Sequence, residues 1–343
     1  MRPTRRGFAV AVIVCFALLQ GIAFGERSLN YVAVPGLAAF AYGAFTLLNA
    51  EKPTVERSAV RPGFPGETRH ETIVVDGSGV ATVAEFSPGG IEADPIERTV
   101  SLPCELDREL RLGERGVYTL GPLTVRQRDP LGLLATATEL EARNEVLVYP
   151  EIYELDRPRV IGELLGGERA TEGQSFDRLR EYQDGDPLTR IHWKSTAKYD
   201  ELLTVESDPI HRTEPIHVAV DGPVTMADDL ATAAGSLGFV LLDAGFEVSL
   251  TLPDAEVPDD RGRHHRENIL GALASTGEGP GWVDDSDSTH LDRRTRDTAD
   301  VLILGDDGTV TVRIGDETVP FDRLRPRSEP TASNRAAIEV SGG

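Results

Sequence analysis

Two uncharged hydrophobic runs open the chain, at residues 7–25 and 31–48. Each run is close to the roughly 20 residues that an α-helix needs to cross the hydrocarbon core of a bilayer. Residues 26–30, which separate the runs, are too few for anything but a tight connection. The pattern therefore predicts a transmembrane helical hairpin over residues 1–50, in preference to a buried hairpin of a soluble domain.

Cationic residues around the two runs predict which side of the membrane the rest of the chain occupies. The connection between the runs holds only Arg27, whereas the outer flanks are richer in cations: Arg2, Arg5, Arg6, Lys52, Arg57 and Arg61. Because Lys and Arg are enriched in cytoplasmic flanks, both ends of the hairpin, and so the soluble domains, are expected in the cytoplasm.

An export signal is the alternative interpretation of the same N-terminus. Residues 4–8 resemble a twin-arginine motif, and Ala23-Phe24-Gly25 is a loose small-residue cleavage site. Export would place the soluble part outside the cell, so this orientation stays open at the level of sequence.

Residues 51–150 show short β-type runs separated by Gly and Pro. Turn signals lie at residues 76–77, 88–90 and 121–122. The strand-like runs are residues 72–75, 80–83, 109–112, 117–120, 123–125 and 145–149. Several short strands at this spacing predict an immunoglobulin-like β-sandwich, a fold typical of spacers and interaction modules.

Strands and helices alternate in residues 211–325. Apolar strand-like runs occupy residues 216–220, 247–252, 301–304 and 310–313, and helical runs occupy 227–244 and 268–274. Buried strands that alternate with helices indicate a parallel, doubly wound α/β sheet. The acidic, Gly-rich stretch 276–298 is expected to be a surface loop, and residues 326–343 a disordered tail.

The densest group of functional side chains lies between these two domains, in residues 151–210. Phe176, Leu179 and Tyr182 recur every third residue, which predicts one short amphipathic helical turn. Residues 184–187 (DGDP) end that turn because proline cannot continue a helix. An apolar strand at residues 202–205 is expected to close the segment.

The net charge of −22 comes from 57 acidic against 35 basic residues. Such a surface repels phosphate backbones and argues against nucleic-acid binding. Only Lys52, Lys194 and Lys198 are lysines, and abundant acids with Arg in place of Lys are typical of a protein from a high-salt cytoplasm, of the haloarchaeal type. The two cysteines, Cys15 and Cys104, suggest neither a disulfide framework nor a zinc site.

The segment GQSFDRLREYQDGDPLTRIHWKSTAK, starting at Gly173, resembles the hallmark of the DUF58 family. Residues 115–122 (RGVYTLGP) and 129–133 (DPLGL) agree with the same family. The resemblance implies an N-terminal membrane hairpin, a β-rich region and a von Willebrand A-like α/β domain. It also implies a partner, a MoxR-type AAA+ ATPase, more readily than it implies a reaction.

A metal site is the first candidate chemistry. In von Willebrand A domains a D-x-S-x-S loop after the first strand binds Mg²⁺, which prefers hard oxygen ligands. The corresponding residues here run from Asp221 to Thr225, with Pro223 in place of the middle hydroxyl, and Asp306 and the adjacent Asp307 follow a later strand. The pattern predicts a degenerate site with weak Mg²⁺ binding or none, and no other cofactor. Alternatively, Asp221 caps the helix that follows.

The family-like segment that starts at Gly173, called the signature segment below, is the second candidate site. Its partner-binding residues are predicted to be Phe176, Leu179, Arg180, Glu181, Tyr182, Gly185, Asp186, Arg190, His192, Trp193, Lys194 and Ser195. His192 and Ser195 lie on one short stretch with no third group to orient the imidazole, so we expect no catalytic residues. Arg180 and Arg190 are suited to bidentate pairing with carboxylates, and Trp193 either packs beneath that clamp or anchors a partner.

The sequence thus favours a membrane-anchored, non-enzymatic scaffold that works with a MoxR-type ATPase in assembly or maturation of other proteins. An extracytoplasmic, metal-dependent ligand-binding module is the alternative. A hydrolytic enzyme is the third hypothesis.

Overall fold

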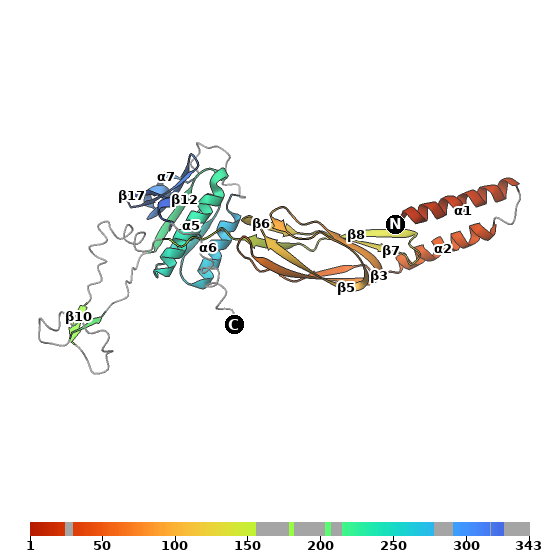
Figure 1. Cartoon of the computed structure of the whole chain (residues 1–343), viewed down its shortest axis with the longest axis horizontal. Helices are drawn as coiled ribbons and strands as arrows, with labels where there is room; N and C mark the ends of the chain where they lie inside the picture. The colour runs from red at the N-terminus through yellow and green to blue at the C-terminus, as the bar shows by residue number, and fades with distance from the viewer. Residues whose placement is uncertain are drawn as a thin grey trace. The chain divides into compact units, whose positions relative to one another are not determined.

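A computed structural model describes residues 1–24, 30–155, 178–181, 203–206, 215–277, 291–315 and 317–325. The chain forms two compact units, Met1–Tyr149 and Pro150–Gly343 (Figure 1). Each unit has its own hydrophobic core.

The two N-terminal runs form long apolar helices, α1 (Arg5–Phe24) and α2 (Asn30–Leu48). They pack against each other, and only 17% of each span is buried. A third segment, 224–243, is also long and apolar enough to cross a membrane, but it is 78% buried inside the second unit. The prediction of two helices able to span a bilayer is therefore confirmed, whereas their orientation remains a prediction.

The rest of the first unit is a β-sandwich. Its strands are β1 (Arg2–Pro3), β2 (Thr54–Arg57), β3 (Thr68–Glu85), β4 (Ile91–Glu92), β5 (Ile96–Leu112), β6 (Gly116–Leu120), β7 (Leu123–Arg128), β8 (Leu134–Leu140) and β9 (Asn144–Val148). One sheet has the order β1-β8-β7-β3-β5-β4 with β2 also paired to β3, and β6 pairs with β9. The sequence pattern missed β1, β2, β4 and β8, which are short or carry small and polar residues.

A corner in the β3–β5 ribbon creates the two layers of the sandwich. The pairing register shifts between Val75 and Gly79, at the turn signal predicted from the sequence. Glu71 and Glu85 lie on opposite sides of this corner, yet both bind Arg57 and Arg108. A straight strand would hold those two glutamates about 46 Å apart. The ribbon must therefore fold back on itself, so residues 72–75 and 80–83 belong to one long bent strand.

Two hydrophobic clusters fill the sandwich. The first cluster lies around the corner and consists of Ile73, Val75, Ala81, Val83, Ile96, Leu102, Leu106, Leu123 and Val125. The second lies around β6 and β9 and consists of Val60, Ile91, Leu110, Leu112, Leu120, Val146 and Val148. Strand β5 contributes to both, because its alternate positions 106 and 110 point inward. The residue between them in that inward row is Arg108, which is 8% exposed.

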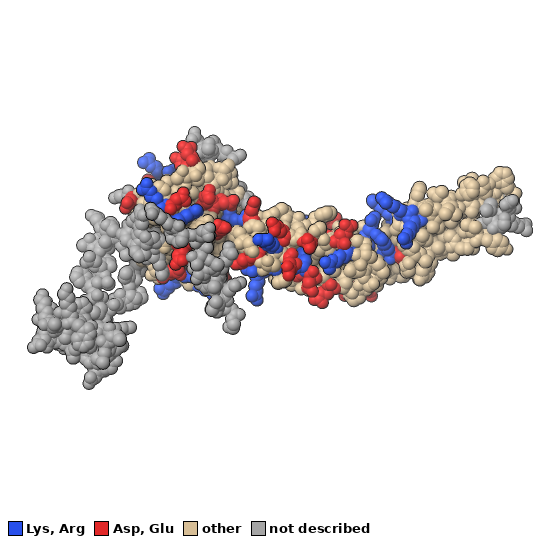
Figure 2. Space-filling model, in the orientation of Figure 1, with Lys and Arg blue, Asp and Glu red and all other residues tan. Residues whose placement is uncertain are grey.

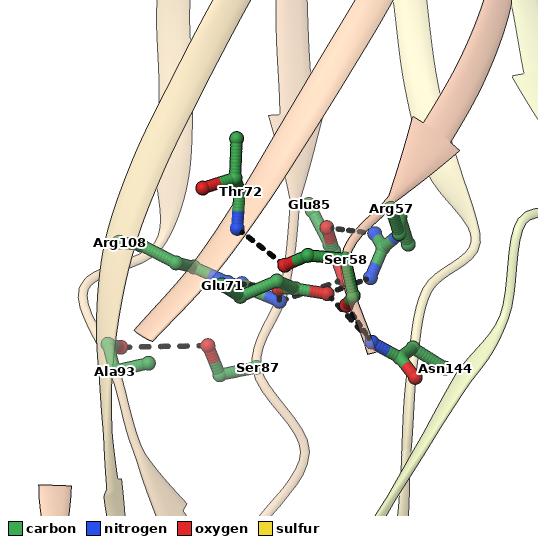
Figure 3. Close-up of polar contacts among 9 residues, drawn as sticks. All are labelled: Arg57, Ser58, Glu71, Thr72, Glu85, Ser87, Ala93, Arg108 and Asn144. Atoms are coloured by element: carbon green, nitrogen blue, oxygen red, sulfur yellow. Dashed lines mark hydrogen bonds and ion pairs between the residues drawn. The ribbon is translucent and has the colours of Figure 1, made fainter. Parts of the chain in front are cut away.

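Arg108 belongs to a buried ionic layer between the two clusters, defined by Arg57, Glu71, Glu85 and Arg108 (Figure 3). Arg57 Nη1 lies 3.2 Å from Glu71 Oε1, and Arg108 Nε donates to Glu71 Oε2 at 2.8 Å. Arg108 Nη2 lies 3.3 Å from Glu85 Oε1, and Arg57 Nη2 also binds Glu85. Asn144 Nδ2 donates to Glu71 Oε1 at 3.2 Å. All four charged side chains are at most 5% exposed.

The second unit contains a six-stranded sheet with helices. Its main elements are β12 (Ile216–Asp221), η4 (Val224–Met226), α5 (Ala227–Asp243), β13 (Val248–Thr251), β14 (Glu256–Asp260), α6 (Arg263–Ser275), α7 (Arg293–Thr298), β15 (Val301–Asp306), β16 (Thr309–Ile314), β17 (Glu317–Pro320) and η5 (Phe321–Arg323). The strand order is β14-β13-β12-β15-β16-β17.

The prediction of a parallel sheet was only partly correct. Strand β12 is parallel to β13 and β15, but β14, β16 and β17 pair antiparallel to their neighbours. The connections explain the difference, because a turn of a few residues can join only antiparallel strands. Asp307-Gly308 forms such a turn, with positive φ at both residues, as a tight two-residue hairpin requires.

Helices lie on both faces of the sheet. Ile216, Val218 and Val220 share the core with α5, and α6 packs beside α5. Asp221 points to the opposite face, where Arg296 of α7 approaches it. Helix α7 corrects the expectation that residues 276–298 are loop throughout, since residues 293–298 are helical. The predicted disordered tail, residues 326–343, lies outside the described residues.

Removing one glutamate tests the ionic layer. Glu71→Ala in the full chain leaves two buried arginines short of a partner, so we expect the β3 and β5 amides to lose about 3–5 kcal/mol of protection, measured by hydrogen exchange in detergent.

The matched control for this variant is Glu92→Ala. Glu92 lies 3.9 Å from Arg111 at the surface, and both side chains are more than 60% exposed. A pair of this kind contributes less than about 1 kcal/mol. Equal losses in the two variants would contradict the structural role of the ionic layer.

Candidate functional site

The predicted metal site lies at the carboxyl end of β12. In open α/β sheets ligands bind beyond the carboxyl ends of the strands, where the strand order reverses. Strand β12 is central to that reversal, with β13 on one side and β15 on the other. Asp221 is the last residue of β12 and is only 1% exposed.

The three predicted ligands differ in exposure to solvent. Asp221 is buried, Thr225 is exposed in η4, and Asp306 is exposed at the end of β15, opposite Thr309. Among the described residues, no group of three or more His, Cys, Asp or Glu side chains is arranged to hold a metal ion.

Backbone contact fills the space between the two strand ends. A Cβ atom added to Gly222 would lie 3.0 Å from both the Cα and the N of Gly305, and equally close to the Leu230 side chain. Only glycines allow this approach, and Gly222 also has a positive φ of 155°. The two strand ends are therefore in close backbone contact just beyond the Asp221–Leu304 pair.

Arg296, which sequence analysis did not single out, occupies the other side of Asp221. Its Nε lies 3.6 Å from Asp221 Oδ2, and its carbonyl accepts a hydrogen bond of 2.5 Å from Arg313 Nη2. The guanidinium thus places a fixed positive charge where a metal ion would be needed. No sequence signal identified it, because 75 residues of chain separate it from its partner in the fold.

Helix α7, which carries Arg296, has a side-chain cap. Asp292 Oδ1 accepts a hydrogen bond of 2.8 Å from the Thr295 backbone N–H. Hydrogen bonds from the side chain and backbone of Thr295 lower the pKa of Asp292. A lowered pKa means that the cap stabilises the folded chain above the carboxyl's ordinary pKa and that this contribution is lost as pH falls.

The signature segment is described only in part. Strand β10 (Arg178–Glu181) pairs antiparallel with β11 (Leu203–Glu206), with Leu179 opposite Val205. The predicted strand near residues 202–205 is confirmed. The predicted helical turn is wrong for residues 178–181, because cross-strand pairing outweighs a three-residue apolar spacing that is too short to specify a helix. Arg180 and Glu181 lie on β10.

The remaining signature residues lie outside the described part of the chain. These are Phe176, Tyr182, Gly185, Asp186, Arg190, His192, Trp193, Lys194 and Ser195. Their roles as partner-binding residues therefore stay a prediction.

The second family-like segment, residues 129–133, lies where the hairpin joins the sandwich. The Thr4 N–H donates to Leu133 O at 2.8 Å, and the Thr4 hydroxyl donates to Gly132 O at 2.5 Å. Thr4 Oγ1 also accepts from the Gly7 N–H at 3.0 Å, within the first turn of α1. Asp129 is 4% exposed and accepts a hydrogen bond of 2.8 Å from the Leu131 N–H. This loop, residues 129–133, is called the junction loop below.

Comparisons with known proteins find similarity to solved structures over part of the chain. No protein-family model matches the chain, and no curated protein matches it. Three solved structures resemble about a third of the chain. The PapD-like domain 7 of human CEP192 matches at 10% identity and a TM-score of 0.23, covering 29% of this chain and 86% of that one.

Two further structures are similar at the same level. The PKD domain of an M14-like peptidase from Thermoplasmatales archaeon SCGC AB-540-F20 is 16% identical, with a TM-score of 0.21, and the match covers 29% of this chain and 94% of that one. A chain of a chaperone–tip adhesin complex of CFA/I fimbriae biogenesis is 8% identical, with a TM-score of 0.19, and the match covers 30% of this chain and 60% of that one. The assignment of a sandwich rests on the strand pairing and the two cores described above.

Magnesium titration tests the strand-end site. Because Arg296 already pairs with Asp221 and Pro223 stands in place of a hydroxyl ligand, we expect isothermal titration of the full chain to detect weak Mg²⁺ binding or none. Micromolar affinity that disappears in Asp221→Ala but persists in Asp259→Ala, an exposed carboxylate of β14, would contradict this expectation.

Proposed function

We propose that this chain is a membrane-anchored, non-enzymatic scaffold that presents its β-sandwich and its second unit to a MoxR-type AAA+ ATPase in the cytoplasm, where it works in the assembly or maturation of other proteins. The observation that carries the proposal is the way in which the hairpin is joined to the sandwich. Strand β1 precedes α1 directly and pairs with β8, so the chain enters the membrane helix from within the sheet.

Close packing at the junction loop strengthens that connection. A Cβ atom at Gly7 of α1 would lie 1.9 Å from Leu133 O, and one at Gly43 of α2 would lie 3.1 Å from Asp129 Cγ. Glycine at both positions lets the helices approach the junction loop more closely than any other residue would. A hairpin held this tightly transmits force to the sandwich, which suits a scaffold acted on by an ATP-driven partner.

The second unit supports a von Willebrand A-like assignment within this proposal. Counted along the chain, its strands have the spatial order 3-2-1-4-5-6, a common order of doubly wound sheets. Its antiparallel last strands and the Asp221–Arg296 pair depart from a metal-binding version of that fold. We therefore favour a binding domain that does not depend on a bound cation.

The signature segment supplies the proposed docking site for the ATPase. It contributes a two-stranded hairpin, β10 and β11, that is separate from the six-stranded sheet. Trp and Arg are enriched at the centres of protein interfaces. We infer that Trp193 and Arg190 make the main contacts with the partner. The identity of that partner rests on the resemblance to the DUF58 family.

Substitution in the signature segment tests the partner. Trp193→Ala and Arg190→Ala should abolish co-purification of the ATPase with the full chain while leaving its melting temperature unchanged, because the contacts are made with another protein. The control is Arg261→Ala. Arg261 is exposed, directly follows β14 and lies outside the signature segment. Variants that fold normally and retain the ATPase would refute the docking site, and a lowered melting temperature would indicate a structural clamp instead.

Cysteine accessibility tests the orientation. In a chain with Cys15 and Cys104 replaced by alanine, Ala59→Cys places a thiol at an exposed site of the sandwich. The arginine distribution predicts that a membrane-impermeant maleimide added to intact cells leaves this thiol unlabelled, whereas lysed cells react. Labelling of intact cells, or a mature chain that lacks residues 1–25, would instead support export.

A further inference from the structure

Basic side chains gather where the two membrane helices meet the sandwich (Figure 2). This basic collar consists of six exposed residues: Arg2, Arg5, Arg6, Lys52, Arg126 and Arg128. The nearest exposed carboxylates in sequence and strand pairing are Glu51, beside Lys52, and Asp76, at the corner. The local excess of positive charge stands against a net charge of −22 for the whole chain.

Strand register places three of these arginines on one face of the sheet. Arg2 and Arg128 both lie opposite Ala135, one on each side of it, in the row β1-β8-β7. Directly paired residues point to the same face, so the two guanidinium groups flank a small residue. Arg126, two residues from Arg128, lies opposite Ala137 on the same face.

No carboxylate interrupts the two rows of cross-strand neighbours that contain Arg128 and Arg126. Beyond Arg128 the first row continues with Val80 and Ser101, and beyond Arg126 the second continues with Thr82 and Thr99. Acidic residues return only in the third row, at Glu139 and Glu97. On this face of the sheet, the cations therefore lie in the two rows that contain Arg128 and Arg126, and the acidic residues lie in the row beyond them.

The junction loop fixes the depth of this face relative to the helices. Arg128 directly precedes Asp129, which lies against Gly43 inside α2, and Leu133 lies against Gly7 in the first turn of α1. Leu131, at the tip of the same loop, is 48% exposed and apolar. The collar thus lies level with the ends of the uncharged spans, where the headgroups of a bilayer would be.

We propose that the basic collar binds the phosphates of anionic lipids in the leaflet that the hairpin enters. The guanidinium fork matches phosphate oxygens in a bidentate manner, and flanking strands hold Arg2 and Arg128 about 10 Å apart, within reach of one headgroup from both sides. Ala135, between the two arginines, is buried, whereas Ala137, opposite Arg126, is exposed. The inference rests on the membrane anchoring proposed above and adds a lipid class to it.

Lipid retention in mass spectrometry tests the collar. The full chain is reconstituted in bilayers of phosphatidylcholine with phosphatidylglycerol, extracted with mild detergent and analysed for bound lipid. The wild type is expected to retain the anionic lipid in excess of its share of the bilayer. Each removed cation is expected to lower that affinity about fivefold, so Arg126→Gln with Arg128→Gln should reduce the excess by about an order of magnitude or more.

Arg98→Gln with Arg111→Gln is the matched control, since both residues are exposed strand positions of the same sandwich outside the two carboxylate-free rows. It should retain the wild-type excess. Arg5 and Arg6 are left unchanged because they also contribute to orientation.

Three outcomes overturn the inference. Equal retention of both lipids by a wild type that resists carbonate extraction refutes the collar and leaves the anchoring intact. If inorganic phosphate abolishes the excess of bound anionic lipid, the collar is a site for the free ion and not for a lipid. Release of the protein by carbonate refutes the anchoring itself, and the inference with it.

Discussion

The buried ionic layer is the constraint on which the first unit depends. Glu71 and Glu85 come from the two arms of one bent ribbon, and Arg57 and Arg108 bind both of them. Nonpolar side chains at these positions would also fill the space, and in other proteins such replacements are often neutral or stabilising. What the charges add is register, because a one-residue slip of either arm would turn a charge away from its partners. The layer therefore selects one alignment of the folded ribbon.

The corner and the junction loop lie at the same end of the sandwich. Ser78, inside the corner, accepts from the Glu51 N–H at 3.1 Å, and its carbonyl accepts from Gln127 Nε2 at 3.1 Å. Glu51 follows α2 closely and Gln127 lies two residues before the junction loop. The position of the two N-terminal helices is consequently tied to the fold of the ribbon, and the ionic layer that sets the ribbon's register also supports these helices and the collar of cations around them.

In the second unit an arginine also pairs with a buried carboxylate. Strands β12, β13 and β15 are parallel, and Asp221 lies at the carboxyl end of β12, where such sheets bind ligands. Arg296 pairs with this carboxylate, and Gly222 and Gly305 are in backbone contact beside it. These features distinguish this strand end from a metal-binding version of the fold, and the docking of a partner at the signature hairpin is our proposal.

The sequence alone determined the elements that depend on local pattern. The uncharged runs identify α1 and α2, the Ala-rich stretch identifies α5, and turn signals locate the corner at Asp76-Gly77 and the turn at Pro88-Gly90, because hydrophobic periodicity and glycine chemistry act within a few residues. Tertiary structure decided the rest. The four members of the ionic layer look like ordinary surface charges in sequence, Arg2 looks like a flanking cation rather than a strand residue, and residues 178–181 look helical. Each owes its place to a partner distant in the chain, and only folding brings such partners within bonding distance.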